Sequence, residues 1–261
     1  MKPALYVSGR RHIEPTLPTG ILREDPFANG FARGLCSAET IGVSDAALRE
    51  LIGAKKPGGD SPVERAVREA RSLGLALAEP RFYLSLHGAR VEQASATVGA
   101  QVFASEVLAR AMEHAEQAAA LLVTVGRPLV ERVSALAQEK NVLAAYLLDA
   151  VGSVLVERTA DLVHADMAAR AARHGLHVGY RYSPGYCDWD ITEQAKLFAL
   201  LDAESIGVRL LPSMLMDPRK SISAIIPLGR DAQSVAEPAC FDCDVRDCPN
   251  RRTEPFVARS D

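Results

Sequence analysis

Apolar residues recur every three to four positions along residues 142–175, the longest stretch with nothing to interrupt it. This spacing is the period of an amphipathic helix, and Gly175 is a typical helix end. The positions that keep it are Leu147, Leu148, Val151, Val154, Leu155 and Leu162. The exposed face of this predicted helix should carry Glu157, Arg158, Asp161, Asp166 and Arg170. We expect the one-turn acidic pair Glu157 and Asp161 to lie on a solvated face.

The same pattern predicts further elements on both sides of this helix. Helices are predicted at residues 44–52, 61–73, 104–116, 127–138 and 191–201, and Ser61 followed by Pro62 has the form of a helix start. Strands are predicted at residues 82–86, 119–124, 208–211 and 221–227, from their aromatic and β-branched content. His87 and Gly88 are expected to close the first strand, and residues 98–102 predict either a loop or a short strand.

The domain organisation follows from the distribution of these elements. We expect one domain over residues 1–237, opening with an irregular arm of about residues 1–43 that is rich in Gly, Pro and Arg. Within this arm, Ala4 to Val7 could add an edge strand. Residues 238–261 form a cysteine-rich C-terminal tail.

Composition and charge exclude several classes of protein. The chain has 261 residues, a formal net charge of -3 and no basic tract, which argues against a dedicated nucleic-acid binder. It lacks an uninterrupted apolar run of about 18 residues, and the N-terminus lacks the charged-then-apolar pattern of a signal peptide. A soluble cytoplasmic protein that binds neither nucleic acid nor membrane is therefore expected.

The segment Arg181 to Tyr186, RYSPGY, is the first candidate for chemistry. Pro184 fixes its own φ and favours an extended Ser183, while Gly185 can adopt backbone angles closed to other residues. Arg181 offers a planar fork for an anion, Ser183 a hydroxyl and Tyr186 an aromatic face with a polar tip. These groups could hold a small, flat, anionic ligand, although the same residues also occur in ordinary connections between helices.

The segment also carries a family resemblance. RYSPGY is followed by ITEQAKLFALLDAESIGVRL and LPSMLMDPRKSISAII, and these three ordered segments resemble the reactivation domain of cobalamin-dependent methionine synthase. Residues 121–157, with Leu-Asp-Ala-x-Gly-Ser and a Glu, look like small free-standing relatives of that domain. The resemblance implies an α+β fold with a twisted antiparallel sheet flanked by long helices.

In that family an Arg-x-x-x-Gly-Tyr loop binds S-adenosylmethionine. The resemblance therefore implies that Arg181, Ser183, Gly185 and Tyr186 hold this ligand, with Arg181 on its carboxylate or another anionic edge. The family pattern continues Pro-Ala, whereas this chain has Cys187-Asp188-Trp189-Asp190. A thiol and two acids beside the loop are compatible with a different ligand or a redox role.

The cysteines of the tail are the second candidate. Cys240, Cys243 and Cys248, followed by Pro249, place three thiolates close enough to hold one soft ion or cluster. A complete site needs a fourth ligand, which Cys187 or Cys36 could supply. An iron-sulfur cluster is favoured slightly over zinc, because the family's task is reductive, and reduced cysteines on a plain tail are the alternative. The histidines, among them His164, show no metal-ligand spacing and are expected to be solvated or at the edge of the core.

The function that the resemblance implies is reductive reactivation of a corrinoid-dependent methyltransferase. Oxidised cobalt is reduced and then trapped by methyl transfer from S-adenosylmethionine. The chain has no Asp-x-His-x-x-Gly motif for corrinoid binding, so cobalamin is expected on a partner protein. Two alternatives stay open: a non-catalytic zinc-binding module that docks a corrinoid protein, and an enzyme for a small anionic substrate with Cys187 as nucleophile.

Overall fold

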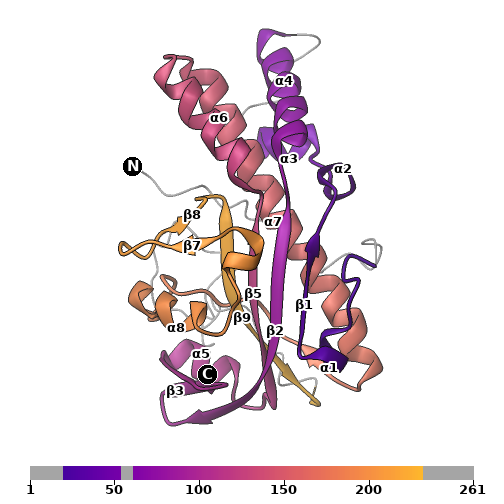
Figure 1. Cartoon of the computed structure of the whole chain (residues 1–261), viewed down its shortest axis with the longest axis vertical. Coiled ribbons are helices and arrows are strands. Elements are labelled where there is room, and N and C mark those ends of the chain that lie inside the picture. The colour runs from indigo at the N-terminus through magenta and orange to yellow at the C-terminus, as the bar shows by residue number, and fades with distance from the viewer. Residues whose placement is uncertain (1–19, 54–60, 232–261) are drawn as a thin grey trace, which may run out of the picture.

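The computed structural model describes residues 20–53 and 61–231, and its centre is an antiparallel sheet (Figure 1). The strand order is β4-β3-β2-β5-β9-β6, and β1 pairs with the first half of β2. The strands are β1 (Phe31–Leu35), β2 (Arg81–Glu92), β3 (Ser95–Val98), β4 (Gln101–Ala104), β5 (Gln117–Thr124), β6 (His177–Val178) and β9 (Ser221–Gly229). The predicted α+β class with an antiparallel sheet is confirmed.

Helices cover this sheet, and the longest of them, α7 (Val142–Arg173), runs behind it (Figure 1). The helices are α1 (Pro26–Asn29), α2 (Ala38–Ile41), α3 (Asp45–Leu51), α4 (Pro62–Leu77), α5 (Glu106–Ala111), α6 (Arg127–Gln138), α7 (Val142–Arg173) and α8 (Gln194–Phe198). Two short 3-10 turns are η1 (Ile191–Glu193) and η2 (Glu204–Ile206). A separate hairpin consists of β7 (Arg209–Leu210) and β8 (Met216–Asp217).

The central strand β5 divides the core into two layers because successive side chains of a strand point to opposite faces. Leu121 and Val123 pack with α4, α6 and α7, whereas Ala118 and Ala120 pack with α5 and α8. The long helix α7 can lie close to its neighbours because it faces glycines. Gly74 of α4 lies against Val151, so that α4 and α7 approach where a larger side chain would clash.

The long periodic elements lie where the sequence predicts them, and the short ones differ. β2 continues through His87 and Gly88 to Glu92, because its second half pairs with β3 and β5. Residues 98–102 belong to the β3–β4 hairpin. The predicted helix at 104–116 is only the six-residue α5, the one at 191–201 is η1 and α8, and residues 208–211 form β7 outside the main sheet.

The N-terminal arm is not irregular throughout, because α1, β1 and α2 all lie within residues 26–41. Its first described residues run along α7. Asp166 of α7 accepts hydrogen bonds from the backbone N–H of Gly20 at 3.2 Å and of Leu22 at 2.7 Å, and its side chain is buried. The prediction that Asp166 lies on an exposed face is therefore wrong: the arm covers this part of α7 and needs an acceptor there. Residues 4–7 lie outside the described residues.

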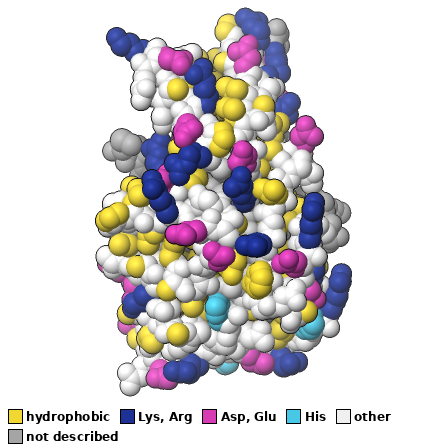
Figure 2. Space-filling view, in the orientation of Figure 1, with side chains coloured by type: hydrophobic (Ala, Val, Ile, Leu, Met, Phe, Trp, Pro, Cys, Tyr) yellow, Lys and Arg dark blue, Asp and Glu magenta, His cyan; other side chains and the backbone are white. Residues whose placement is uncertain are grey.

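The surface agrees with the charge balance of the sequence. Figure 2 shows acidic and basic side chains interspersed over the visible face, without a continuous basic stripe. Within residues 20–53 and 61–231, the helices are too short or too polar to span a lipid bilayer.

Candidate ligand-binding site

The loop Arg181–Tyr186 is held to the sheet at its start by Tyr182. The backbone N–H of Tyr182 donates to the carbonyl of Ile225 at 2.9 Å, and Ile225 returns a bond of 2.8 Å to the carbonyl of Tyr182. The Tyr182 side chain is buried in the layer on the α8 side of the sheet. Ser183 Oγ donates a further hydrogen bond of 2.7 Å to the carbonyl of Ser223. The start of the loop therefore lies alongside β9 and bonds to it.

The second half of the loop is a tight turn closed by Trp189. The Gly185 N–H donates to the Trp189 carbonyl at 2.8 Å, and the Trp189 N–H donates to the Tyr186 carbonyl at 3.0 Å. Gly185 has a φ of 89° and Cys187 a φ of 54°, a region that glycine adopts more readily than other residues. Trp189 is buried, whereas Tyr186 is 45% exposed at the tip of the turn.

A stripe of polar residues on α7 faces the sheet edge from which this loop leaves. Asp149, Ser153, Glu157 and Asp161 are four residues apart, so they share one side of the helix. We call this set the α7 polar stripe. The four-residue spacing of the stripe is visible in the sequence. The prediction of a solvated pair Glu157 and Asp161, however, missed two basic residues on the sheet side that contact the stripe.

Those two basic residues are Arg181 and Lys220. The Arg181 guanidinium lies 2.7 Å from an Asp161 carboxylate oxygen and 3.4 Å from one of Glu157. Lys220, the residue before β9, lies 2.9 Å from Asp149. Each end of the α7 polar stripe is thus neutralised by a cation from the sheet side.

Lys220 also contacts the middle of the stripe. Its Nζ lies 2.7 Å from Ser153 Oγ, and Ser153 Oγ donates to the Asp149 carbonyl at 3.1 Å. Gly152 makes this contact possible, because a Cβ there would lie 3.3 Å from the Lys220 side chain and 2.8 Å from Leu129. Gly152, the glycine of the Leu-Asp-Ala-x-Gly-Ser segment, therefore leaves room for the Lys220 side chain to pass over α7.

In the ion pairs of the site, the basic side chains are largely buried and the acidic side chains are partly exposed. Arg181 and Lys220 side chains are only 9% and 12% exposed, whereas those of Glu157 and Asp161 are 33% and 42% exposed. Within residues 20–53 and 61–231, three carboxylates of the stripe meet these two cations, and the acids of each ion pair are more exposed than the cation. Such a surface attracts a cationic or zwitterionic ligand.

His164 lies behind the Arg181 ion pair. The residue is buried, and burial together with the positive charge of Arg181 lowers the pKa of His164 to about 3. It is therefore neutral at pH 7. The imidazole of His164 is not solvated, as one part of the expectation had it, but lies in the core. Because it is neutral there, it adds no charge to the site.

Of the four residues predicted to hold a ligand, two use their side chains within the fold. Arg181 pairs with α7 and Ser183 bonds to β9, while Gly185 and Tyr186 form the exposed turn. The structure thus brings the four residues together in one loop next to the α7 polar stripe. Their contact with a ligand stays a prediction.

The predicted metal site cannot be placed, because Cys240, Cys243 and Cys248 lie outside the described residues. The described part of the chain contains no cluster of three or more His, Cys, Asp or Glu side chains suited to a metal ion. Cys36 is buried, and burial raises the pKa of its thiol to about 11. Because a thiolate is the metal-binding form, Cys36 is a poor candidate for the fourth ligand, and the assignment of that role to Cys187 stays a prediction.

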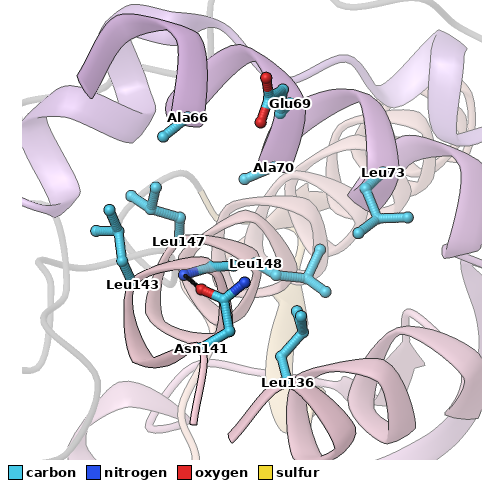
Figure 3. Close-up of a pocket in the computed structure, with 10 residues that line it drawn as sticks. Ala66, Glu69, Ala70, Leu73, Leu136, Asn141, Leu143, Leu147 and Leu148 are labelled. Atoms are coloured by element: carbon cyan, nitrogen blue, oxygen red, sulfur yellow. Dashed lines mark hydrogen bonds between the residues drawn. The ribbon is translucent and has the colours of Figure 1, made fainter. Parts of the chain in front are cut away.

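A groove of about 250 Å³ lies elsewhere, between α4, α6 and the start of α7 (Figure 3). Its lining is largely aliphatic, with Leu73, Leu136, Leu143 and Leu147 pointing into it (Figure 3). The side chain of Asn141 caps α7 there, accepting a bond of 3.3 Å from the Ala144 N–H. None of the residues lining this groove belongs to the loop or to the α7 polar stripe.

Comparisons with known proteins agree with the fold. The family model described as "Vitamin B12 dependent methionine synthase, activation domain" matches residues 83–244. Among solved structures, the chain is similar to the MetH reactivation domain bound to AdoHcy, with a TM-score of 0.57 and 18% sequence identity, over 78% of this chain and 79% of that chain. No curated protein matches. Because the family match spans more than half of the chain, this protein belongs to the family of vitamin B12-dependent methionine synthase activation domains.

Proposed function

We propose that this chain binds S-adenosylmethionine at the Arg181–Tyr186 loop and supports the reductive reactivation of a corrinoid-dependent methyltransferase. Family membership supports the corrinoid context. The similar solved structure is of a domain bound to AdoHcy, which supports an adenosyl ligand of this type.

The observation that carries the proposal is the position of the loop beside the α7 polar stripe, where the carboxylates of Glu157 and Asp161 are partly exposed. S-adenosylmethionine has a sulfonium, an ammonium and a carboxylate, and so one net positive charge. Glu157 and Asp161 would face the positive end of the ligand, because their carboxylates are the more exposed members of their ion pairs. After methyl transfer the product has a neutral thioether, which such a site binds less tightly.

The loop residues have separate roles in this proposal. Arg181 would bind the ligand carboxylate, and its ion pair with Asp161 would hold the guanidinium in place for this contact. The tight turn brings the Gly185 backbone close to the ligand, and Tyr186 offers its ring as a stacking face. The Ser183 backbone binds a polar edge while its Oγ keeps the loop on β9.

The chemistry requires two reactants to be held together, which is the main contribution of the protein. A corrinoid brought by the partner and reduced by an external electron donor would supply the acceptor for the methyl group. The carbon–sulfur bond of S-adenosylmethionine would break in that transfer, and S-adenosylhomocysteine would leave. The corrinoid is expected to arrive on a partner, either a corrinoid-binding protein or the methyltransferase itself.

A coupled absorbance assay tests the function. The full chain is mixed with a cobalamin-loaded corrinoid protein in the cobalt(II) state, a chemical reductant and S-adenosylmethionine, and methylcobalamin formation is followed. We expect the chain to accelerate methylation, with no acceleration when S-adenosylhomocysteine replaces the methyl donor. An unchanged rate with several corrinoid partners would contradict reactivation while leaving ligand binding to be judged separately.

The tail cysteines define a finer proposal about the electron. Cys240, Cys243 and Cys248, with Cys187 as the fourth ligand, would hold an iron-sulfur cluster that passes an electron to cobalt. Anaerobic purification with iron, sulfide and zinc analysis tests this. Stoichiometric zinc without sulfide would favour the alternative, a non-catalytic module that docks a corrinoid protein.

A further inference from the structure

The turn at residues 185–189 is fastened to the start of α5, about eighty residues earlier in the chain. We propose that Asp188 is a positioning residue for the ligand loop and acts by capping α5 from outside that helix. Asp188 lies in the Cys187-Asp188-Trp189-Asp190 segment, where the sequence departs from the family pattern. The inference rests on the proposed function of the loop but concerns how the loop is held.

Asp188 accepts hydrogen bonds from three donors at the beginning of α5. Its Oδ1 is 2.8 Å from Ser105 Oγ and 3.4 Å from the Val107 N–H, and its Oδ2 accepts from the Glu106 N–H. The first N–H groups of a helix have no partner within the helix and favour a negative charge. Ser105 caps the Leu108 N–H in the usual local way at 3.1 Å, so Asp188 supplies the remaining acceptors.

A second carboxylate fastens the other side of the same turn. Glu193 is buried and accepts from Trp189 Nε1 at 3.0 Å and from the Ala104 N–H of β4 at 2.9 Å. The indole of Trp189 also packs edge-to-face on Phe103, with ring centroids 5.3 Å apart. Glu193 and Trp189 thus bind the turn to β4, while Asp188 binds it to α5.

These two attachments define the shape of the exposed turn. The bonds between Gly185, Tyr186 and Trp189 close the turn internally, and Asp188 and Trp189 connect it to α5 and β4. With Asp188 removed, the segment would keep its buried indole and lose its attachment to α5. The loop would then sample other conformations, and ligand binding would carry the cost of ordering it.

The test compares Asp188→Asn with Asp190→Asn in the full chain. Asp190 is the matched control, because its carboxylate accepts hydrogen bonds from the N–H and hydroxyl of Thr192 in the following turn and, among the described residues, makes no contact with α5. Amide hydrogen exchange reports the loop directly at Gly185 and Trp189, whose N–H groups are both bonded. Titration calorimetry with S-adenosylmethionine reports its function.

We expect exchange at Gly185 and Trp189 to become about tenfold faster in Asp188→Asn, as for the loss of charge-assisted bonds. The Kd for S-adenosylmethionine should rise by about tenfold, and Asp190→Asn should change neither quantity by more than about threefold. The Leu121 amide of the central strand β5, which is paired with β2 on one side and β9 on the other, reports global unfolding, and its exchange should stay unchanged. If Asp188→Asn fails to fold, Ser105→Ala removes one of the three bonds, together with the cap on the Leu108 N–H, and should give a smaller shift in the same direction.

Unchanged exchange at Gly185 and Trp189 in Asp188→Asn would overturn the proposal. If the wild-type chain does not bind S-adenosylmethionine, the proposed function fails, while the exchange rates still decide whether Asp188 holds the turn. Faster exchange with an unchanged Kd would also overturn it, because the loop would then be restrained without positioning the ligand.

Discussion

Glu157→Gln tests whether the α7 polar stripe recognises the positive charge of the ligand. Glu157 is the better choice for this test, because Arg181 lies closer to Asp161 and keeps that partner at 2.7 Å when Glu157 is neutralised. Glutamine preserves the size of the side chain. We therefore expect a stability loss of at most about 1 kcal/mol, as for a partly exposed ion pair.

The effect on binding follows from Coulomb's law. Two unit charges about 5 Å apart interact by about 0.8 kcal/mol in water and about 3 kcal/mol at the effective dielectric of a protein surface. With its side chain 33% exposed, Glu157 lies between these limits. We expect a loss of about 1–2 kcal/mol, so the Kd for S-adenosylmethionine should rise about five- to thirtyfold.

Titration calorimetry with both S-adenosylmethionine and S-adenosylhomocysteine makes the result specific. Because the thioether of the product is neutral, its Kd should change by less than about twofold. Glu139→Gln, which breaks an exposed ion pair with Arg132 on α6, is the control and should affect neither ligand. An equal loss for both ligands in Glu157→Gln would refute recognition of the sulfonium by Glu157, since both ligands share the ammonium group and differ only at the sulfur.

Three further predictions address Arg181, the core and pH. Arg181→Ala should weaken binding of both ligands by more than about tenfold in the same titration, because both have the carboxylate assigned to this residue; an unchanged Kd would remove that role. Since the folded pKa of His164 lies below its ordinary value of 6.5, the unfolded state binds more protons between these values. The free energy of unfolding should thus fall by about 2 kcal/mol from pH 7 to pH 5 through this residue, and urea titrations of His164→Gln should lack this component. Gly74→Ala would place a Cβ 2.4 Å from Val151 and should lower stability by about 1–3 kcal/mol, despite the better helix propensity of Ala; a raised melting temperature would show that α4 and α7 can separate freely.

Periodicity predicted the long elements well because each is determined by its own residues. The helix predicted at residues 127–138 is α6, and α7 differs from its prediction by two residues at one end. The β1 strand was missed because the sequence Phe-Ala-Arg-Gly-Leu alternates poorly between apolar and polar residues. Its conformation depends on pairing with β2, which is far away in the sequence.

In the candidate site, too, local features could be predicted from the sequence and tertiary contacts could not. The loop could be found from its residues and from the family resemblance, and the four-residue spacing of the α7 polar stripe is visible in the sequence. What the sequence does not show is which cation meets which carboxylate, since Arg181 reaches Asp161 only after α7 and the sheet pack together. The bond from Asp188 to α5 is likewise a tertiary contact, and no local pattern indicates it.

Titration of the wild-type chain with S-adenosylmethionine tests the central claim most directly. The proposal predicts one saturable site, tighter for S-adenosylmethionine than for S-adenosylhomocysteine, and a matching change in the amide signals of residues 181–186. Absence of binding up to millimolar ligand, or binding that leaves those amide signals unchanged, would contradict it.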